Sequence, residues 1–185
     1  MQDSSWQSFS ERVTYDDGLH VSRAALPQPF GDLQRAAMRE RNLSVLGTLA
    51  VFGERRSEPV DDESPMAQEL VRLDSKLNVM MAMLDQFLQR DAQLPSRQPV
   101  QFNAIGAVLP TAVWPAAETS GLLRIHFDGC LALPLEIPAR RVQERDGDHV
   151  FVAFEALDDA TCDALERLVF RHHRRKVAER RQTAS

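Results

Sequence analysis

Apolar residues recur at alternating steps of four and three over residues 66–88. They are Met66, Leu70, Leu73, Leu77, Met80, Leu84 and Phe87. This is the heptad spacing of helices that pack along a shared apolar seam. Met81, Met83 and Leu88 widen that seam beyond a two-stranded coiled coil, where charged residues usually flank it. The pattern predicts a long helix that self-associates in more than two copies. The competing interpretation is one amphipathic helix packed on its own domain.

The residues ahead of this helix predict a hairpin, a helix and a connector. Two short strand-like runs between residues 12 and 21 flank Gly18, where a positive φ would close a hairpin turn. Apolar residues at helical spacings predict a helix over residues 32–52. The acidic, proline-bearing residues 54–65 predict a solvated connector, and Pro65 suits the first turn of the heptad helix.

After Pro95 the sequence changes to short apolar runs separated by Gly and Pro. These predict strands near residues 100–102, 106–109, 121–127, 130–137 and 150–154. Asp146 and Gly147 form a turn before the last strand, and Asp158 or Asp159 caps a final helix. Short strands at this spacing predict a small closed β-barrel.

The fold class that follows is α+β: an N-terminal hairpin and helices, a long coiled-coil helix, and a C-terminal barrel with a terminal helix. The corresponding regions are residues 1–64, 65–94 and 95–185.

Composition narrows the range of functions. The 43% hydrophobic and 26% charged residues are typical of a soluble protein. Cys130 and Cys162 lack disulfide-framework or zinc spacing, and no signal peptide or membrane span is evident, so we expect a cytoplasmic location without membrane insertion. The histidines show no metal-ligand spacing, and no nucleophile elbow or phosphate-binding loop occurs. We therefore expect no enzyme activity, no metal and no cofactor.

The basic end of the last helix, around His172 and His173, is the only candidate patch for nucleic acid or phosphate. Residues 95–185 carry twelve Lys or Arg against twelve Asp or Glu, so their charges cancel. A solvated helix end, with cations near the carbonyl dipole, explains the patch better, and we expect no nucleic-acid partner.

Three stretches of the C-terminal half carry a family resemblance: residues 101–106 (QFNAIG), 137–142 (IPARRV) and 150–157 (VFVAFEAL). In order and spacing they resemble a PilZ domain, a small six-stranded β-barrel that many bacteria use in cyclic di-GMP signalling. The heptad helix ahead of them is similar to that of the atypical, tetramer-forming PilZ proteins. The resemblance implies a regulatory protein that forms a homotetramer, with motility and virulence as its outputs.

The resemblance also implies a nucleotide site built from an Arg-x-x-x-Arg motif and a later Asp/Asn-x-Ser-x-x-Gly motif. The chain offers Arg90 and Arg97, seven residues apart instead of four. If Gly106 ends the second motif, Gln101 replaces its Asp/Asn and Asn103 replaces its Ser. Amides can still form hydrogen bonds, but each lost guanidinium contact with phosphate costs about 1.5–3 kcal/mol. We expect weak or absent cyclic di-GMP binding.

These observations together predict a non-catalytic, oligomeric adaptor that acts by contact with an unidentified signalling protein. Two alternatives stay open. One is a cyclic di-GMP receptor with an atypical nucleotide site, and the other is a purely structural oligomeric scaffold.

Overall fold

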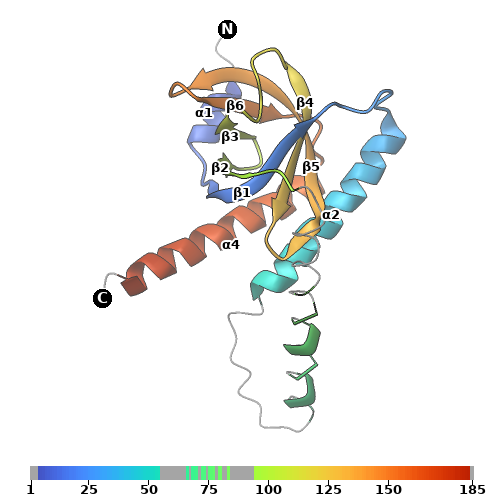
Figure 1. Ribbon diagram of the computed structural model, residues 1–185, viewed down its shortest axis with the longest axis vertical. Coiled ribbons are helices and arrows are strands. Elements are labelled where there is room, and N and C mark those ends of the chain that lie inside the picture. Colours follow the sequence, from blue (N-terminus) through green and yellow to red (C-terminus); the bar gives the residue numbers. More distant parts are fainter. Residues whose placement is uncertain are drawn as a thin grey trace.

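The computed structural model describes residues 4–54 and 94–183 and, between them, residues 66, 68–70, 72–73, 75–77, 79–80 and 83 (Figure 1). The elements are α1 (Ser4–Ser10), β1 (Tyr15–Ala24), α2 (Asp32–Glu54), β2 (Arg97–Phe102), β3 (Gly106–Pro110), β4 (Ser120–Phe127), β5 (Cys130–Arg145), β6 (His149–Phe154) and α4 (Asp159–Thr183). The described residues between 66 and 83 are helical.

The six strands form a closed antiparallel barrel in the order β1-β2-β3-β6-β5-β4. The first half of β1 pairs with β2, with Tyr15 opposite Phe102, and its second half pairs with β4, with Val21 opposite Ile125. Closure leaves no strand edge unpaired around the ring. The predicted α+β fold with a six-stranded barrel and a terminal helix is confirmed.

The N-terminal hairpin predicted around Gly18 is not formed. Residues Tyr15–Ala24 are one continuous strand, and Gly18 lies inside it opposite Pro99. Among the described glycines only Gly129 and Gly147 have positive φ. The reason is the period-two burial of Tyr15, Leu19 and Val21, which points them all into the barrel. The barrel therefore extends beyond residues 95–185, because its first strand comes from the N-terminal segment.

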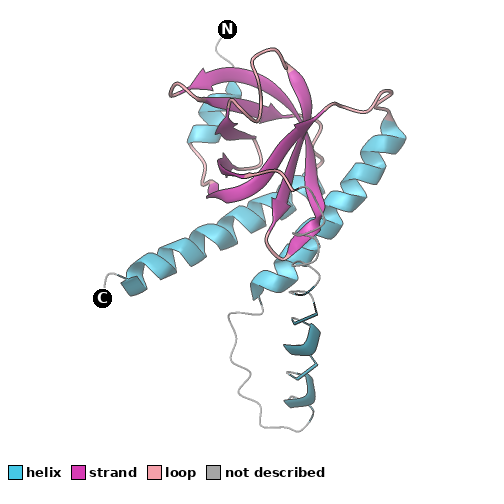
Figure 2. Ribbon diagram, in the orientation of Figure 1, coloured by secondary structure: helices cyan, strands magenta, loops and turns pink. Residues whose placement is uncertain are grey.

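Two helices pack on the same side of the barrel. In Figure 2, α2 runs down the right-hand side of the strands to their lower end, and α4 extends from beneath the strands to the lower left. Val45 of α2 and Leu165 of α4 are buried in the same cluster as Phe102 and Ile125 of the barrel. Burial of each such side chain contributes about 1.5–3 kcal/mol to stability. One apolar core thus joins the barrel to both helices.

Local signals in the sequence place the end of the barrel correctly. Asp146 (φ 41°) and Gly147 (φ 78°) lie in the three-residue turn between Arg145, the last residue of β5, and His149, the first residue of β6. Asp158 caps α4, because its carboxylate accepts hydrogen bonds from the Thr161 backbone amide at 3.1 Å and the Thr161 hydroxyl at 2.7 Å. Both predictions are confirmed. Helix α1, in contrast, was not predicted.

Candidate functional site

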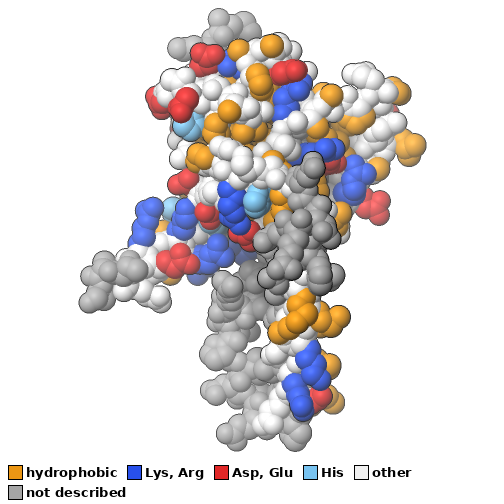
Figure 3. All heavy atoms as spheres, in the orientation of Figure 1, with side chains coloured by type: hydrophobic (Ala, Val, Ile, Leu, Met, Phe, Trp, Pro, Cys, Tyr) orange, Lys and Arg blue, Asp and Glu red, His pale blue; other side chains and the backbone are white. Residues whose placement is uncertain are grey.

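The heptad positions that the structure describes form an exposed apolar surface. Their exposed fractions are 72% for Met66, 60% for Leu70, 48% for Leu73, 52% for Leu77 and 59% for Met80. We call these five residues the heptad ridge. Figure 3 shows hydrophobic side chains of this segment at the molecular surface. Leu84 and Phe87 of the predicted seam lie outside the described residues.

An exposed row of large apolar side chains on one helix is typical of an interface. The alternative was that the stripe packs on its own domain, but the barrel buries none of the five ridge residues in a single chain. Met83, beside the ridge, is also exposed, at 56%. The segment can bury this surface by packing against other helices of the same kind.

The second candidate site contains the five residues that the sequence offers in place of the two nucleotide-binding motifs of PilZ domains, from which it departs. Arg90 lies outside the described residues. Arg97 begins β2, where its guanidinium donates to the Gly18 carbonyl at 2.8 Å and pairs with Asp128. Gln101 is exposed on β2 opposite Asp16. Arg97 is thus the only cation among the described members of the set, and its positive charge already has a partner.

Asn103 and Gly106 meet in the turn between β2 and β3. The backbone amide of Asn103 donates to the Gly106 carbonyl at 3.1 Å. The Asn103 side chain accepts from the Ile105 amide at 2.9 Å and donates to the Phe9 carbonyl at 3.1 Å. Asn103 is 3% exposed, so its amide is engaged inside the protein and closes the turn.

Gly106 is required by close packing. A Cβ at this position would lie 2.3 Å from the Val152 carbonyl oxygen and 2.7 Å from the Phe151 ring. Only glycine allows β3 to approach β6 so closely. In this chain Asn103 therefore closes the turn and Gly106 allows β3 to pack closely on β6, whether or not a ligand binds.

Helix α1 covers the surface beside this turn. The rings of Trp6 and Phe9 pack on Phe151 with centroids 5.2 and 5.0 Å away, and the Arg145 guanidinium lies 4.0 Å from the Trp6 ring centroid. Sequence analysis missed this seven-residue helix because it is too short for a clear period. The spacing of Trp6 and Phe9, three residues apart, was the available signal.

Other site chemistry is sparse in the described ranges. No three His, Cys, Asp or Glu side chains gather there closely enough to hold a metal ion. Burial, followed by the nearby negative charge of Asp158, raises the pKa of the Cys162 thiol, which disfavours a nucleophilic thiolate. Among the helices that the structure describes, none has the length and apolar character needed to cross a bilayer.

Comparison with known proteins agrees with this geometry. Residues 46–182 match the family described as atypical PilZ domain, cyclic di-GMP receptor. No curated protein matches the chain. Among solved structures, a pathogenic protein from Xanthomonas campestris with a tetrameric PilZ domain, self-assembled via an unusual helical bundle, has a similar fold. It is 22% identical, the alignment covers 95% of this chain and 96% of that chain, and the TM-score is 0.69.

The matched residues include five of the six barrel strands, the heptad ridge and almost all of α4. The match thus spans most of the chain. The chain belongs to the atypical PilZ family.

Proposed function

We propose that this protein is an oligomeric, non-catalytic regulatory protein of the cytoplasm that acts in cyclic di-GMP-related signalling. The heptad ridge gathers several copies, and each copy presents its barrel to a protein partner. The exposed ridge is the observation that carries the proposal: five large apolar side chains on one helix are between 48% and 72% exposed in the single chain. Linked copies turn a second contact with a partner into an intramolecular event, which raises avidity without new chemistry.

A tetramer is the favoured assembly. The similar Xanthomonas campestris protein is tetrameric and assembles via a helical bundle. In this chain the exposed Met83 beside the ridge supports the same choice, because a wide apolar face suits more than two helices. Burial of each large apolar side chain contributes about 1.5–3 kcal/mol before the cost of association is subtracted.

The assembly is tested with the double variant Leu73→Asp and Leu77→Asp. Two carboxylates per chain in a desolvated bundle carry a penalty of several kcal/mol each, so we expect light scattering to show four chain masses for the wild type and one for the variant. The matched control is Gln68→Asp with Ser75→Asp, which adds the same charges at heptad positions facing away from the seam. A monomeric wild type, or equal dissociation of the control, would contradict the proposal.

We further propose that cyclic di-GMP binds weakly or not at all. The buried Asn103 amide and the paired Arg97 guanidinium support this, because a ligand would have to displace their present partners. Isothermal titration of cyclic di-GMP into the full chain tests the proposal, with a PilZ protein of known affinity as a positive control. We expect no resolvable heat at micromolar concentrations. A submicromolar dissociation constant would instead support the receptor alternative, which the family description favours.

Co-purification distinguishes a regulatory protein from the alternative of a purely structural scaffold. A regulatory protein should retain a specific signalling protein, and the monomeric ridge variant should retain less of it because avidity is lost. Loss of motility or virulence on deletion of the protein is the expected physiological output.

A further inference from the structure

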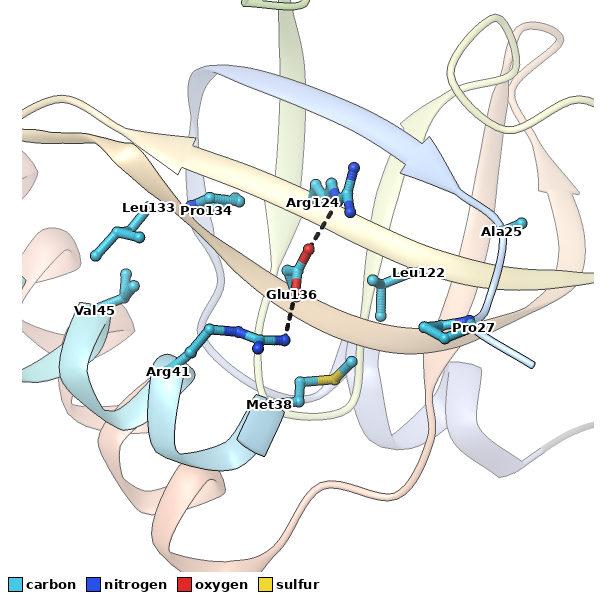
Figure 4. A pocket seen from close by; sticks show the side chains of 10 residues that line it. All are labelled: Ala25, Pro27, Met38, Arg41, Val45, Leu122, Arg124, Leu133, Pro134 and Glu136. Carbon is cyan, nitrogen blue, oxygen red and sulfur yellow. Dashed lines mark hydrogen bonds and ion pairs between the residues drawn. The ribbon is translucent and has the colours of Figure 1, made fainter. Parts of the chain in front are cut away.

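A groove of about 340 Å³ runs between the first half of α2 and strands β4 and β5 (Figure 4). Its centre holds three charged side chains. Glu136 of β5 accepts a hydrogen bond from Nε of Arg124 at 2.8 Å and another from Arg41 at 3.2 Å. The two arginines come from different elements, β4 and α2, and the carboxylate between them is 13% exposed.

The charge in the groove is unbalanced. Two guanidinium groups share one carboxylate, which leaves a net charge of one positive unit. The side chains of Arg41 and Arg124 are 55% and 44% exposed. Each guanidinium has five N–H donors, and within the described residues each makes a hydrogen bond only to Glu136. Donors therefore remain for one further anionic group.

Apolar side chains lie on both sides of this charged centre. Figure 4 shows Val45, Leu133 and Pro134 toward one end of the groove and Met38, Leu122 and Pro27 toward the other. Leu133 is 51% exposed, which is unusual for a leucine in a barrel strand. The groove thus presents an apolar, a cationic and a second apolar section in order.

The width of the groove is set by a hydrogen-bonded clamp. The Asn42 side chain donates to the Glu136 carbonyl at 2.7 Å and accepts from the Glu136 amide at 3.0 Å. Asn42 is 3% exposed. The clamp fastens α2 to β5 at the residue that pairs the two arginines. A surface held in place before binding avoids part of the entropy cost of association.

We propose that this groove binds an extended segment of a partner protein in which one acidic residue stands between two apolar residues. Every second side chain of an extended segment points the same way, so an apolar–x–acidic–x–apolar sequence matches the three sections. The carboxylate of the bound segment accepts hydrogen bonds from Arg41 and Arg124. Its two apolar side chains cover the exposed Leu133 at one end and the exposed Pro27, which lies near the buried Met38, at the other. This inference rests on the proposed adaptor function and names the chemistry of its partner.

The test uses the full-length oligomer and a synthetic peptide, acetyl-Gly-Leu-Ser-Asp-Ser-Leu-Gly-amide. Nuclear magnetic resonance of labelled Met and Leu methyl groups and of arginine Nε groups reports the binding position. We expect shifts at the Met38 and Leu133 methyls and at Arg124 Nε. A peptide with Asn in place of Asp should bind about tenfold more weakly or less, because the charge-assisted hydrogen bonds are lost.

Variants of the protein complete the test. Arg41→Glu and the milder Arg41→Gln should weaken peptide binding at least about tenfold. Arg35→Glu is the matched control, because it makes the same charge change on α2 outside the groove, and it should leave binding unchanged. The monomeric ridge variant should still bind the peptide. The groove and the assembly can therefore fail independently, and a monomeric wild type that binds the peptide would refute only the assembly.

Several outcomes would overturn the inference. They are equal affinity for the Asp and Asn peptides, shifts confined to other surfaces, equal weakening by Arg35→Glu, and no shifts up to about 1 mM peptide, the weak end of measurable affinity. Sodium octanoate tests whether the groove binds small organic acids instead of a protein segment. If octanoate saturates the groove at lower concentration than the peptide, the site belongs to small organic acids and the peptide proposal is wrong.

Discussion

The ring of Tyr15 stacks on the imidazole of His172, with the ring centroids 3.6 Å apart and the planes 17° from parallel. Tyr15 is in the first strand and His172 in the last helix. His172 Nε2 donates to the Asp16 carbonyl at 3.2 Å, and Nδ1 accepts from Arg175 at 3.3 Å. These contacts fit a neutral imidazole. They join the first strand to the last helix. Burial raises the pKa of Tyr15 and lowers the pKa of His172.

Tyr15 offers a titration with a single reporter, because it is the only tyrosine in the chain. Burial, followed by the negative charge of Asp17, raises the pKa of Tyr15 from 10.0 to about 12. Ultraviolet titration should show one phenol transition near pH 12 in the folded protein and near pH 10 in denaturant. The neutral phenol favours the fold, so this contribution to stability is complete below pH 10 and is lost as the pH rises toward 12. Tyr15→Phe should remove the transition, and a native transition at pH 10 would show that the ring is not buried.

His172 predicts a loss of stability in mild acid. Burial lowers the pKa of His172 below 6.5, with a smaller lowering by Arg175, while the hydrogen bond to Asp16 acts in the opposite direction. The unfolded chain binds a proton near pH 6.5 and the folded chain binds it only at lower pH. The contribution is therefore complete above about pH 6.5 and is lost as the pH falls toward the folded pKa.

Urea denaturation between about pH 7 and pH 5 measures this change. His172→Phe keeps an aromatic ring against Tyr15 and should flatten the dependence of the unfolding free energy on pH. His173→Phe changes an exposed neighbouring residue and should leave the pH dependence of the unfolding free energy as in the wild type. Identical slopes in both variants would mean that His172 is not the titrating group.

Gly106 and Gly18 form a matched pair of barrel glycines with opposite expected responses. Gly106→Ala should destabilise the protein by at least about 2 kcal/mol, because the new Cβ overlaps the Val152 carbonyl and β3 must move away from β6. Gly18→Ala meets nothing within 4 Å and should stay within about 1 kcal/mol of the wild type or stabilise it slightly. Thermal unfolding of both variants measures the difference. Similar melting temperatures would disprove the close contact at Gly106.

The candidate nucleotide-binding residues show which contacts a local motif can predict and which it cannot. Asn103 and Gly106, two of the motif positions, share a backbone hydrogen bond in one turn. Alignment could not show that the Asn103 amide is bound to Phe9, or that Arg97 is paired with Asp128. These partners are 94 and 31 residues away in the sequence, so no local pattern contains them.

Local patterns in the chain were sufficient to predict its short-range elements. Side-chain alternation predicted β4 and the first half of β5, Asp146 and Gly147 predicted a turn, and Asp158 predicted the start of α4, because each depends on residues within a few positions. Packing between distant segments makes Tyr15–Ala24 a barrel strand between β2 and β4 rather than half of a hairpin. It also brings Arg41, Arg124 and Glu136 together in one site. Both depend on which distant segments become neighbours, and that choice is made by the burial of the whole core rather than by any single stretch of chain.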